Sequence, residues 1–257
     1  MEEISSEDQR KIQLEMLQEI DAFCRKNNIK YMLAYGTLLG AIRHKGFIPW
    51  DDDVDISMPL EDMRRFKKSF VSEKIEYHDG DTDKYFDWDF SKISYKPTYA
   101  KVGKIFYTYG VNIDLYPVVE CPSDPDEIKK KIALFKKYSD VREFFLWWRR
   151  RFITRFPIKT IPGYLWAYRR CRNYRLNEFP TPGGGSYYFI AGLPEHAPHD
   201  IIPFNPFEEL IDVEFEGFKF KAPARYHEYL TIRYGDYMQL PPEDQRTPYH
   251  GGHFYWK

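Results

Sequence analysis

Apolar and polar positions follow regular periods through the N-terminal part of the chain. Residues 7–26 place apolar side chains at the three- to four-residue spacing of an amphipathic helix, with Ser6 available as its N-cap. Residues 29–36 ("IKYMLAYG") are an apolar run that predicts a short buried strand ending at Gly36. Residues 37–46 ("TLLGAIRHKG") predict a short helix closed by its final glycine. The chain therefore begins as helix, strand, tight turn and helix.

Strands and helices continue to alternate after this point. Residues 54–60 ("VDISMPL") alternate polar and apolar side chains, as a half-buried strand does, and residues 60–70 ("LEDMRRFKKSF") have helical spacing. Residues 99–119 are rich in β-branched and aromatic side chains and predict two strands with a turn near Gly110. The pattern indicates an α/β fold in which helices flank a small mixed sheet.

The second half of the chain reads as helices followed by a hairpin. Residues 122–138 predict a helix opened at Ser123, and the basic, aromatic segment 140–200 reads mostly as helix, Pro-Gly break and helix, with a glycine-rich loop into a strand. Residues 205–257 predict a hairpin, a helix and an irregular tail. No repeat or low-complexity linker divides the chain, so we expect one domain over 1–257.

The hairpin and the helix after it carry clear boundary signals. The hairpin turns at Glu216 and Gly217, and the helix runs from Pro223 to Tyr234, where Gly235 stops it.

The composition of the chain argues against several classes of function. The 38 Lys and Arg balance 39 Asp and Glu, so the formal charge of -1 argues against a general nucleic-acid coat. Cys24, Cys121 and Cys171 lie far apart with no CxxC pair, which fits a reducing compartment. The N-terminus lacks the features of a signal peptide, and no apolar run reaches membrane-spanning length. We therefore expect a cytoplasmic protein that binds no nucleic acid.

Charge is concentrated in one segment. Residues 142–175 contain ten Lys and Arg against Glu143 alone, a local charge of +9, with aromatic residues between the cations. Trp, Tyr and Arg suit a surface that meets anionic lipid headgroups, which predicts peripheral contact with the cytoplasmic face of a membrane. A helical pair that packs its apolar face into the core explains the segment equally well.

The strongest chemical signal is the acidic run at residues 51–55. Asp51, Asp52, Asp53 and Asp55 fall within five positions, and Asp53 and Asp55 flank one apolar residue at the mouth of the predicted strand. The two-residue period of a strand points both carboxylates to the same face. Mg²⁺ binds through one or two carboxylates and completes its shell with water and phosphate oxygens, and Mn²⁺ takes the same ligands.

Asp114 supplies a third acid, within the apolar strand "VNIDLYP". A lone buried carboxylate is costly unless it is paired or bound to a metal, so a position beside Asp53 and Asp55 would explain all three. A solvated acidic turn is the alternative, but Val54 and Ile56 alternate with the acids as in a half-buried strand. The metal site is the favoured interpretation.

Residues around the acidic run are candidates for phosphate binding. Gly36 and Thr37 lie at the start of a predicted helix, where backbone N–H groups welcome anions. Further candidate cations, which a solvated loop or an exposed strand face would explain nearly as well, are Arg43, His44, Lys45, Lys101 and Lys104.

Together, these motifs resemble the LicD family, to which the fukutin-like proteins are related. The resemblance rests on "YGTLLGAIRHKGFIPWDDDVDISM", on "NIDLYP" and on "FKAPARYHEYLTIRYGDYMQLPP" near the C-terminus. It implies a nucleotidyltransferase-type fold with a Gly-Ser/Thr turn at Gly36 and Thr37, an acid pair at Asp53 and Asp55, and Asp114 as third acid. It also implies a catalytic core over 1–122, completed by 205–257, with 140–200 as an insertion facing the acceptor or a membrane.

The resemblance further implies an activity. Members of the family transfer a phosphorylated alcohol, often phosphocholine, from a CDP-linked donor to a sugar hydroxyl and release CMP; the expected acceptor is a cell-surface glycan or its lipid-linked precursor. Asp53 and Asp55 would hold one or two Mg²⁺ ions at the donor diphosphate. Asp114 would complete the metal site or accept the hydroxyl proton.

Several weaker assignments accompany this activity. The C-terminal motif suggests Arg233, Arg246 and His250 as further site residues by resemblance alone. If the donor carries choline, its ammonium group would need aromatic faces and a nearby acid, for which the candidates are Trp50, Tyr85, Phe86, Trp88, Asp83, Asp87 and Asp89.

Two other functions remain open. The same fold could attack the α-phosphate of a nucleoside triphosphate and release pyrophosphate. The protein could also be a non-catalytic membrane-surface module that binds Ca²⁺. Choline, ethanolamine, glycerol and ribitol all remain open as the alcohol of the donor.

Overall fold

The computed structural model describes residues 2–82, 86, 88, 90–102, 105–152, 162–189, 199–247 and 253–257. The chain divides into two compact units. The first comprises Met1–Tyr77, Lys92–Tyr116 and Pro206–Lys257, and the second comprises His78–Ser91 and Pro117–Asn205.

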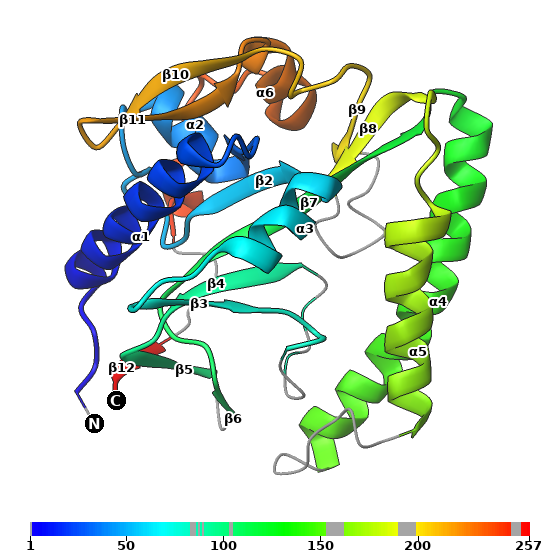
Figure 1. The fold of residues 1–257 in the computed structure, drawn as a ribbon, viewed down its shortest axis with the longest axis horizontal. Coiled ribbons are helices and arrows are strands. Elements are labelled where there is room, and N and C mark those ends of the chain that lie inside the picture. The colour runs from blue at the N-terminus through cyan, green and yellow to red at the C-terminus, as the bar shows by residue number, and fades with distance from the viewer. Residues whose placement is uncertain are drawn as a thin grey trace. The chain divides into compact units, whose positions relative to one another are not determined.

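The first unit holds most of the strands, and Figure 1 shows their arrangement. Its helices are α1 (Ser6–Lys26), α2 (Tyr35–Arg43), α3 (Leu60–Ser69), α6 (Tyr226–Tyr234) and the 3₁₀-helix Glu243–Gln245. Its strands are β1 (Met32–Leu33), β2 (Asp55–Pro59), β3 (Ile75–His78), β4 (Ser91–Tyr95), β5 (Thr98–Val102), β6 (Ile105–Tyr107), β7 (Asn112–Pro122, which runs on into the second unit), β10 (Leu210–Phe215), β11 (Phe218–Pro223) and β12 (His253–Trp256).

The main sheet has the order β1-β2-β7-β4-β3, which places β2 and β7 next to each other. β1 and β2 are antiparallel, with Met32 opposite Ser57. β2 and β7 are buried along almost their whole length, so their apolar side chains form the core of the sheet. A polar side chain on either strand therefore lies inside the protein, where it needs a partner or a ligand. The mixed α/β fold predicted from the sequence is confirmed.

The structure corrects several predicted boundaries. The N-cap of α1 is Ser5, whose hydroxyl accepts a hydrogen bond from the Asp8 N–H at 3.0 Å, and not Ser6. Residues 99–119, predicted as two strands, contribute to three, because β5 and β6 form a separate sheet with β12. The tail is therefore not wholly irregular: β12 pairs antiparallel with β5, a long-range contact that local patterns do not reveal.

The C-terminal hairpin forms as predicted. β10 and β11 are antiparallel, and Glu216 (φ 51°) and Gly217 (φ 78°) both adopt the left-handed conformation that a two-residue hairpin turn requires. α6 begins at Tyr226, three residues after the predicted start, and ends at Gly235, which has a φ of 67°.

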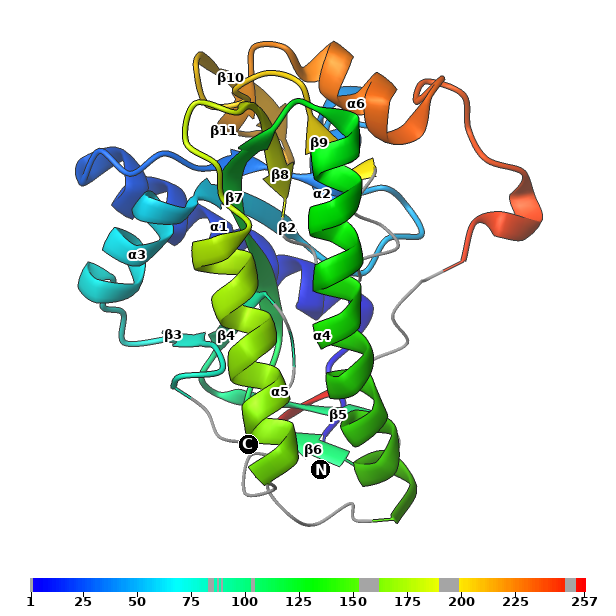
Figure 2. The same cartoon turned by 90° about the vertical axis from the view of Figure 1, so that its right-hand side faces the viewer.

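The second unit is mostly helical, as predicted for the basic, aromatic segment. Its elements are α4 (Pro125–Phe152), α5 (Pro162–Asn173), the π-helix Tyr174–Glu178, β8 (Gly185–Phe189) and β9 (Ile201–Ile202). Within this unit, β8 pairs antiparallel with the C-terminal part of β7. Figure 2 shows α4 and α5 lying side by side. α4 begins three residues later than predicted and continues without a break to Phe152.

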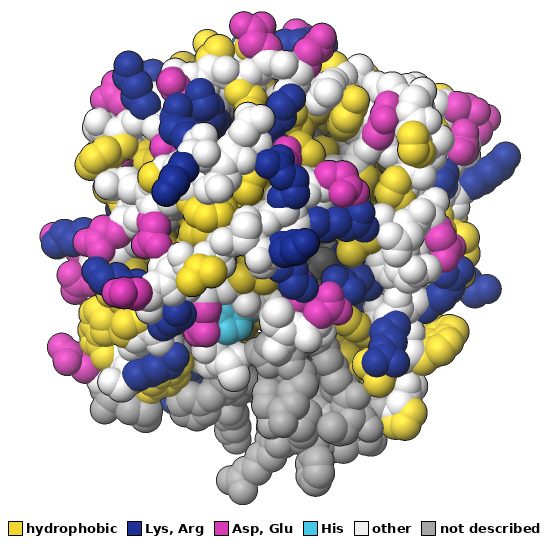
Figure 3. Space-filling model, viewed as in Figure 1, with side chains coloured by type: hydrophobic (Ala, Val, Ile, Leu, Met, Phe, Trp, Pro, Cys, Tyr) yellow, Lys and Arg dark blue, Asp and Glu magenta, His cyan; other side chains and the backbone are white. Residues whose placement is uncertain are grey.

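The surface and the cysteines agree with the sequence analysis. Figure 3 shows acidic and basic side chains interspersed on the face drawn, as the near-zero net charge predicts. All three cysteines are buried and reduced. Among the described residues, no helix combines the length and the apolar character needed to cross a bilayer.

Candidate active site

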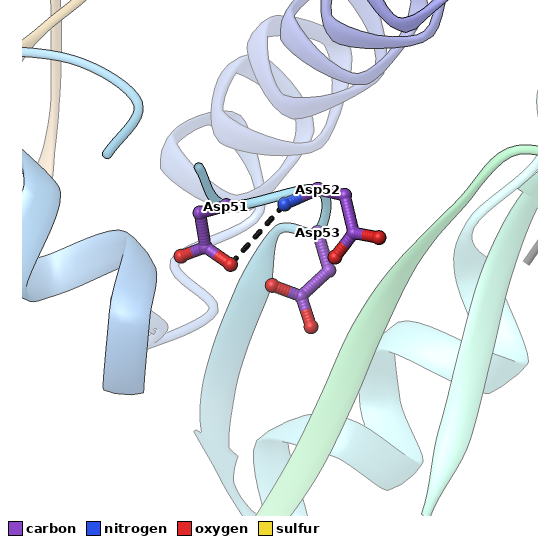
Figure 4. A group of neighbouring side chains, drawn as sticks. All are labelled: Asp51, Asp52 and Asp53. Carbon is purple, nitrogen blue, oxygen red and sulfur yellow. Dashed lines mark hydrogen bonds between the residues drawn. The ribbon is translucent and has the colours of Figure 1, made fainter. Parts of the chain in front are cut away.

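The acidic run forms the loop that leads into β2. Asp51, Asp52 and Asp53 are half-buried, and each offers a carboxylate oxygen that lies within 4.8 Å of the other two. Figure 4 shows the three side chains projecting from this loop. Like charges held so close repel one another, so the arrangement is unfavourable unless protons or a cation neutralise it. We call Asp51–Asp53 together with Asp55 the acidic cluster.

Side chains of α1 fix the backbone of the acidic loop. The Arg10 guanidinium donates to the carbonyl oxygens of Pro49 and Asp51, both at 2.8 Å. Gln9 donates to the Asp52 carbonyl at 2.5 Å, and the amide of Gln13 donates to the Asn112 carbonyl at 3.2 Å. The bonds from Arg10 and Gln9 therefore hold the loop through its carbonyl groups and not through its carboxylates.

The Gly-Thr turn at the start of α2 packs directly against the acidic cluster. The Thr37 hydroxyl accepts a hydrogen bond from the Asp55 N–H at 2.8 Å and so connects the helix to the first residue of β2. A Cβ atom on Gly36 would lie 2.5 Å from Oδ2 of Asp51, so only glycine fits there without displacing that carboxylate. Gly36 and Thr37 thus help to position the acids of the loop.

Asp55 is the most deeply buried acid of the cluster. Its side chain is enclosed by the protein, and Oδ1 has no hydrogen-bond partner among the described residues. Burial and the charges of Asp53, Asp114 and Asp51 raise its pKa well above the ordinary value. A buried carboxylate oxygen without a donor is the kind of ligand that a divalent cation would satisfy.

Asp114 lies on β7 beside the acidic loop. Its N–H donates to the Val54 carbonyl at 2.8 Å, which holds β7 next to the start of β2. Its Oδ1 accepts hydrogen bonds from Lys92 at 2.5 Å and from Asn112 at 2.8 Å. Its Oδ2 contacts the Tyr116 hydroxyl at 3.5 Å. The two oxygens therefore have different partners: the Lys92 ammonium group neutralises the first, and the Tyr116 hydroxyl contacts the second.

Electrostatics in the site favour a cation. Burial, followed by the neighbouring carboxylates of Asp53 and Asp52, raises the pKa of Asp51 to about 8. Burial and nearby acids, with Asp55 first among them, also raise the pKa of Tyr116. Each acid raises the cost of ionising the others, and a bound Mg²⁺ would remove that cost. The residues present therefore fit a hard divalent cation.

The cations predicted near the acidic run have structural contacts. The Arg43 guanidinium donates to the Tyr237 carbonyl at 2.9 Å and to Nδ1 of His44 at 3.3 Å. Burial lowers the pKa of both Arg43 and His44. Lys45 adopts a φ of 62°, and its carbonyl accepts the Glu216 N–H at 2.8 Å. Arg43 and Lys45 link the end of α2 to C-terminal segments, and the role of all three residues in donor binding stays a prediction.

The remaining candidates are spread more widely. Lys101 lies on β5, opposite His253 of β12, in a different sheet from the acids. Arg233 and Arg246 stack on the rings of Tyr35 and Trp50, at 4.6 Å and 5.5 Å. Phe86 is buried and Trp88 is half-buried, both in the second unit. The candidates that lie outside the described residues are Lys104, His250, Asp83, Tyr85, Asp87 and Asp89.

Sequence reasoning missed two polar residues of the site. Lys92 is buried on β4 and forms the ion pair with Asp114. Gln13 is 1% exposed and occupies the apolar face of α1. Gln13 carries a local signal, because it is a polar side chain on the apolar face of a helix, whereas Lys92 alternates with Ser94 and carries none. Asp51 and Asp52 belong to the acidic run seen in the sequence, but the sequence assigned them no role of their own. With Asp53 they form a group whose carboxylate oxygens all lie within 4.8 Å of one another.

Comparison with known proteins supports the interpretation of this site. Residues 28–134 match the model of the LicD, FKTN and FKRP nucleotidyltransferase domain. This range contains β1, α2, the acidic loop, β2, Lys92 and Asp114. The resemblance to the LicD family that the sequence motifs indicated is therefore confirmed over this range.

Named relatives agree with this family. The lipopolysaccharide cholinephosphotransferase LicD of Haemophilus influenzae is 29% identical over 97% of each chain. Mouse ribitol 5-phosphate transferase FKRP is 54% identical over 35 residues, which are 14% of this chain and 7% of that protein. An uncharacterised Rickettsia typhi protein, RT0683, is 46% identical over 21% of this chain and 18% of its own length. The similarity is thus end to end with one relative and local with the others.

Proposed function

We propose that this protein transfers a phosphorylated alcohol, phosphocholine in the first instance, from a CDP-linked donor to a sugar hydroxyl and releases CMP. The observation that carries the proposal is the buried Asp55 oxygen, which has no donor among the described residues and feels the charges of Asp53, Asp114 and Asp51. The relative that matches end to end is named a cholinephosphotransferase, and the local match is named a ribitol 5-phosphate transferase. These names support transfer of a phosphorylated alcohol.

In this mechanism, Asp53 and Asp55 would hold one or two Mg²⁺ ions, with Asp51 and Asp52 within reach of Asp53. Bound there, the metal would neutralise charge on the transferring phosphoryl group and on the departing CMP. Gly36 and Thr37 hold the acids in place and offer the start of α2 to donor oxygens. Arg43, His44, Lys45, Lys101 and Lys104 remain candidates for further donor contacts.

Asp114 acts on the acceptor in this account. Lys92 and Asn112 donate to its Oδ1 and hold the carboxylate beside the acidic loop, and this carboxylate accepts the proton of the attacking hydroxyl. The sugar oxygen forms a bond to the phosphorus that bears the alcohol, and the bond from that phosphorus to the CMP oxygen breaks. The proton resides on Asp114, and the electron pair leaves with CMP. The acceptor is a cell-surface glycan or its lipid-linked precursor.

Product analysis tests this proposal directly. The protein is incubated with Mg²⁺, lipopolysaccharide as acceptor, and CDP-choline, CDP-ethanolamine, CDP-glycerol or CDP-ribitol in turn, and CMP is quantified. We expect acceptor-dependent CMP release with one donor, reduced about a thousandfold or more in Asp55→Asn and unchanged in Asp126→Asn, an exposed acid of the second unit. Pyrophosphate release from a nucleoside triphosphate would instead favour the nucleotidyltransferase alternative. This alternative stays open because the domain that residues 28–134 match is described as a nucleotidyltransferase domain.

A further inference from the structure

The contact between α4 and α5 uses only one face of each helix. Leu146 of α4 forms a buried cluster with Tyr164 and Tyr168 of α5, and Phe145 packs against it. A Cβ atom on Gly163 would lie 2.4 Å from the Phe145 ring, so glycine permits the close approach of the two helices. The inward-facing apolar positions therefore already account for the stability of this pair.

Further large apolar side chains of the pair face away from that contact. Phe144 and Trp147 of α4 are 59% and 58% exposed, and Trp166 of α5 is 58% exposed. The rings of Phe144 and Trp147 stack with centroids 6.4 Å apart. Leu134 and Val141 extend the exposed face along α4. We call Leu134, Val141, Phe144, Trp147 and Trp166 the aromatic face.

Exposed cations accompany the aromatic face. Lys137 lies between Leu134 and Val141 on α4, and Arg169 follows Trp166 on α5; both are exposed. The exposed acid Asp140 of the same stretch is paired with Lys136 at 2.9 Å. Apolar and basic residues are thus interspersed, which is the composition of a surface that meets lipid headgroups.

Other cations of the segment have internal roles. Arg142 and Arg175 are buried, while Arg170 and Arg172 form ion pairs with Glu178 and Asp81. The full charge of +9 in residues 142–175 is therefore not displayed at the surface. One apolar face of the pair packs inside the unit, as the core-packing explanation expected, and further apolar side chains are exposed.

We propose that the aromatic face docks on the surface of an anionic lipid bilayer. Trp and Phe would enter the headgroup boundary, while Lys137 and Arg169 pair with lipid phosphates. Charge complementarity favours anionic lipid over a second copy of this chain, since a copy would bring cations against cations. The proposal concerns a surface distinct from the acidic cluster and makes no use of catalysis.

Flotation with lipid vesicles tests the proposal on the full chain. We expect the wild type to float with vesicles of phosphatidylcholine and phosphatidylglycerol, and to float less with phosphatidylcholine alone or at high salt. The double variant Trp147→Gln, Trp166→Gln should lose about tenfold or more of the affinity for anionic vesicles. Phe218→Gln, which removes an exposed aromatic from the β11 hairpin in the first unit, is the matched control and should float like the wild type.

Circular dichroism verifies that the variants are folded. Equal flotation of the double variant and the wild type would overturn the proposal, as would equal binding to neutral and anionic vesicles. Absence of wild-type flotation, with self-association lost in the double variant, would assign the face to a second copy instead. Because flotation needs no turnover, its failure would leave the proposed transferase activity intact.

Discussion

The acidic cluster and the aromatic face depart from ordinary protein structure in opposite directions. In the first, carboxylates and a lysine lie where apolar side chains normally pack; in the second, tryptophans and a phenylalanine lie where polar ones normally do. Both arrangements lower stability or solubility relative to ordinary packing. The difference teaches where to look for function: the buried anomaly indicates chemistry, and the exposed one indicates a surface to be covered.

The Lys92–Asp114 pair gives the largest expected stability effect. Lys92→Met would leave the Asp114 carboxylate buried without its counter-ion, so we expect the free energy of unfolding to fall by roughly 3–5 kcal/mol in urea titrations. Lys11→Met removes the exposed Lys11–Glu7 pair and should cost less than about 1 kcal/mol. Equal effects of the two substitutions would remove the distinction between buried and exposed polar groups.

The pH dependence of the metal-free protein is the next largest effect. The pKa of Asp51 is raised from 3.8 to about 8, so the folded state retains a proton that the unfolded state loses. Its stability contribution is complete below about pH 4 and is lost as the pH rises toward about 8. We expect the free energy of unfolding to fall as the pH rises over this range, and Asp51→Asn to reduce that fall, in urea titrations at a series of pH values. A stability that rises with pH in the wild type but not in Asp51→Asn would contradict this electrostatic picture.

Gln13 tests how the acidic loop is held. Gln13→Leu removes the hydrogen bonds to the carbonyls of Asn112 and Asp52, and we expect a loss of about 1 kcal/mol together with weaker Mg²⁺ binding. Gln18→Leu, a half-buried position on the same helix, should leave Mg²⁺ binding unchanged. If Gln13→Leu binds Mg²⁺ like the wild type, the contact from α1 is structural only.

The aromatic face should give the smallest effect on stability. Trp147→Gln exchanges an exposed aromatic for a polar residue, so we expect the free energy of unfolding to change by less than about 0.5 kcal/mol while solubility rises. A loss of several kcal/mol would show that Trp147 belongs to the packing of the second unit.

Local sequence patterns predicted several helices and the C-terminal hairpin, because these elements depend on residues that are close together in the sequence. The period of residues 7–26 predicted α1, and the Glu216–Gly217 turn predicted the β10–β11 hairpin, since both depend on neighbours in sequence. The pairing of β12 with β5 was missed because strands about 150 residues apart leave no local signal. Lys92 was missed for the same reason: its partner Asp114 lies on another strand.

In the candidate site, too, features set by neighbouring residues were predicted and features set by long-range contacts were not. The two-residue period predicted a half-buried strand after the acidic run; β2 follows the run as expected but is buried along almost its whole length. The family motif placed Gly36 and Thr37 in the same site. Which carboxylates approach one another depends on the path of the loop, which Arg10, Gln9 and Gln13 hold from α1. The assignment of Asp53, Asp55 and Asp114 as metal ligands stays a prediction.

Calorimetric titration with Mg²⁺ tests the central claim, that the acidic cluster binds a divalent cation for phosphoryl transfer. It would be performed on the wild type, Asp55→Asn and the control Asp126→Asn, each with and without CDP-choline. The account predicts that the wild type and the control bind Mg²⁺ and bind it more tightly with CDP-choline present, whereas Asp55→Asn does neither while staying folded. Undiminished Mg²⁺ binding by folded Asp55→Asn, or the absence of binding by the wild type under both conditions, would contradict it.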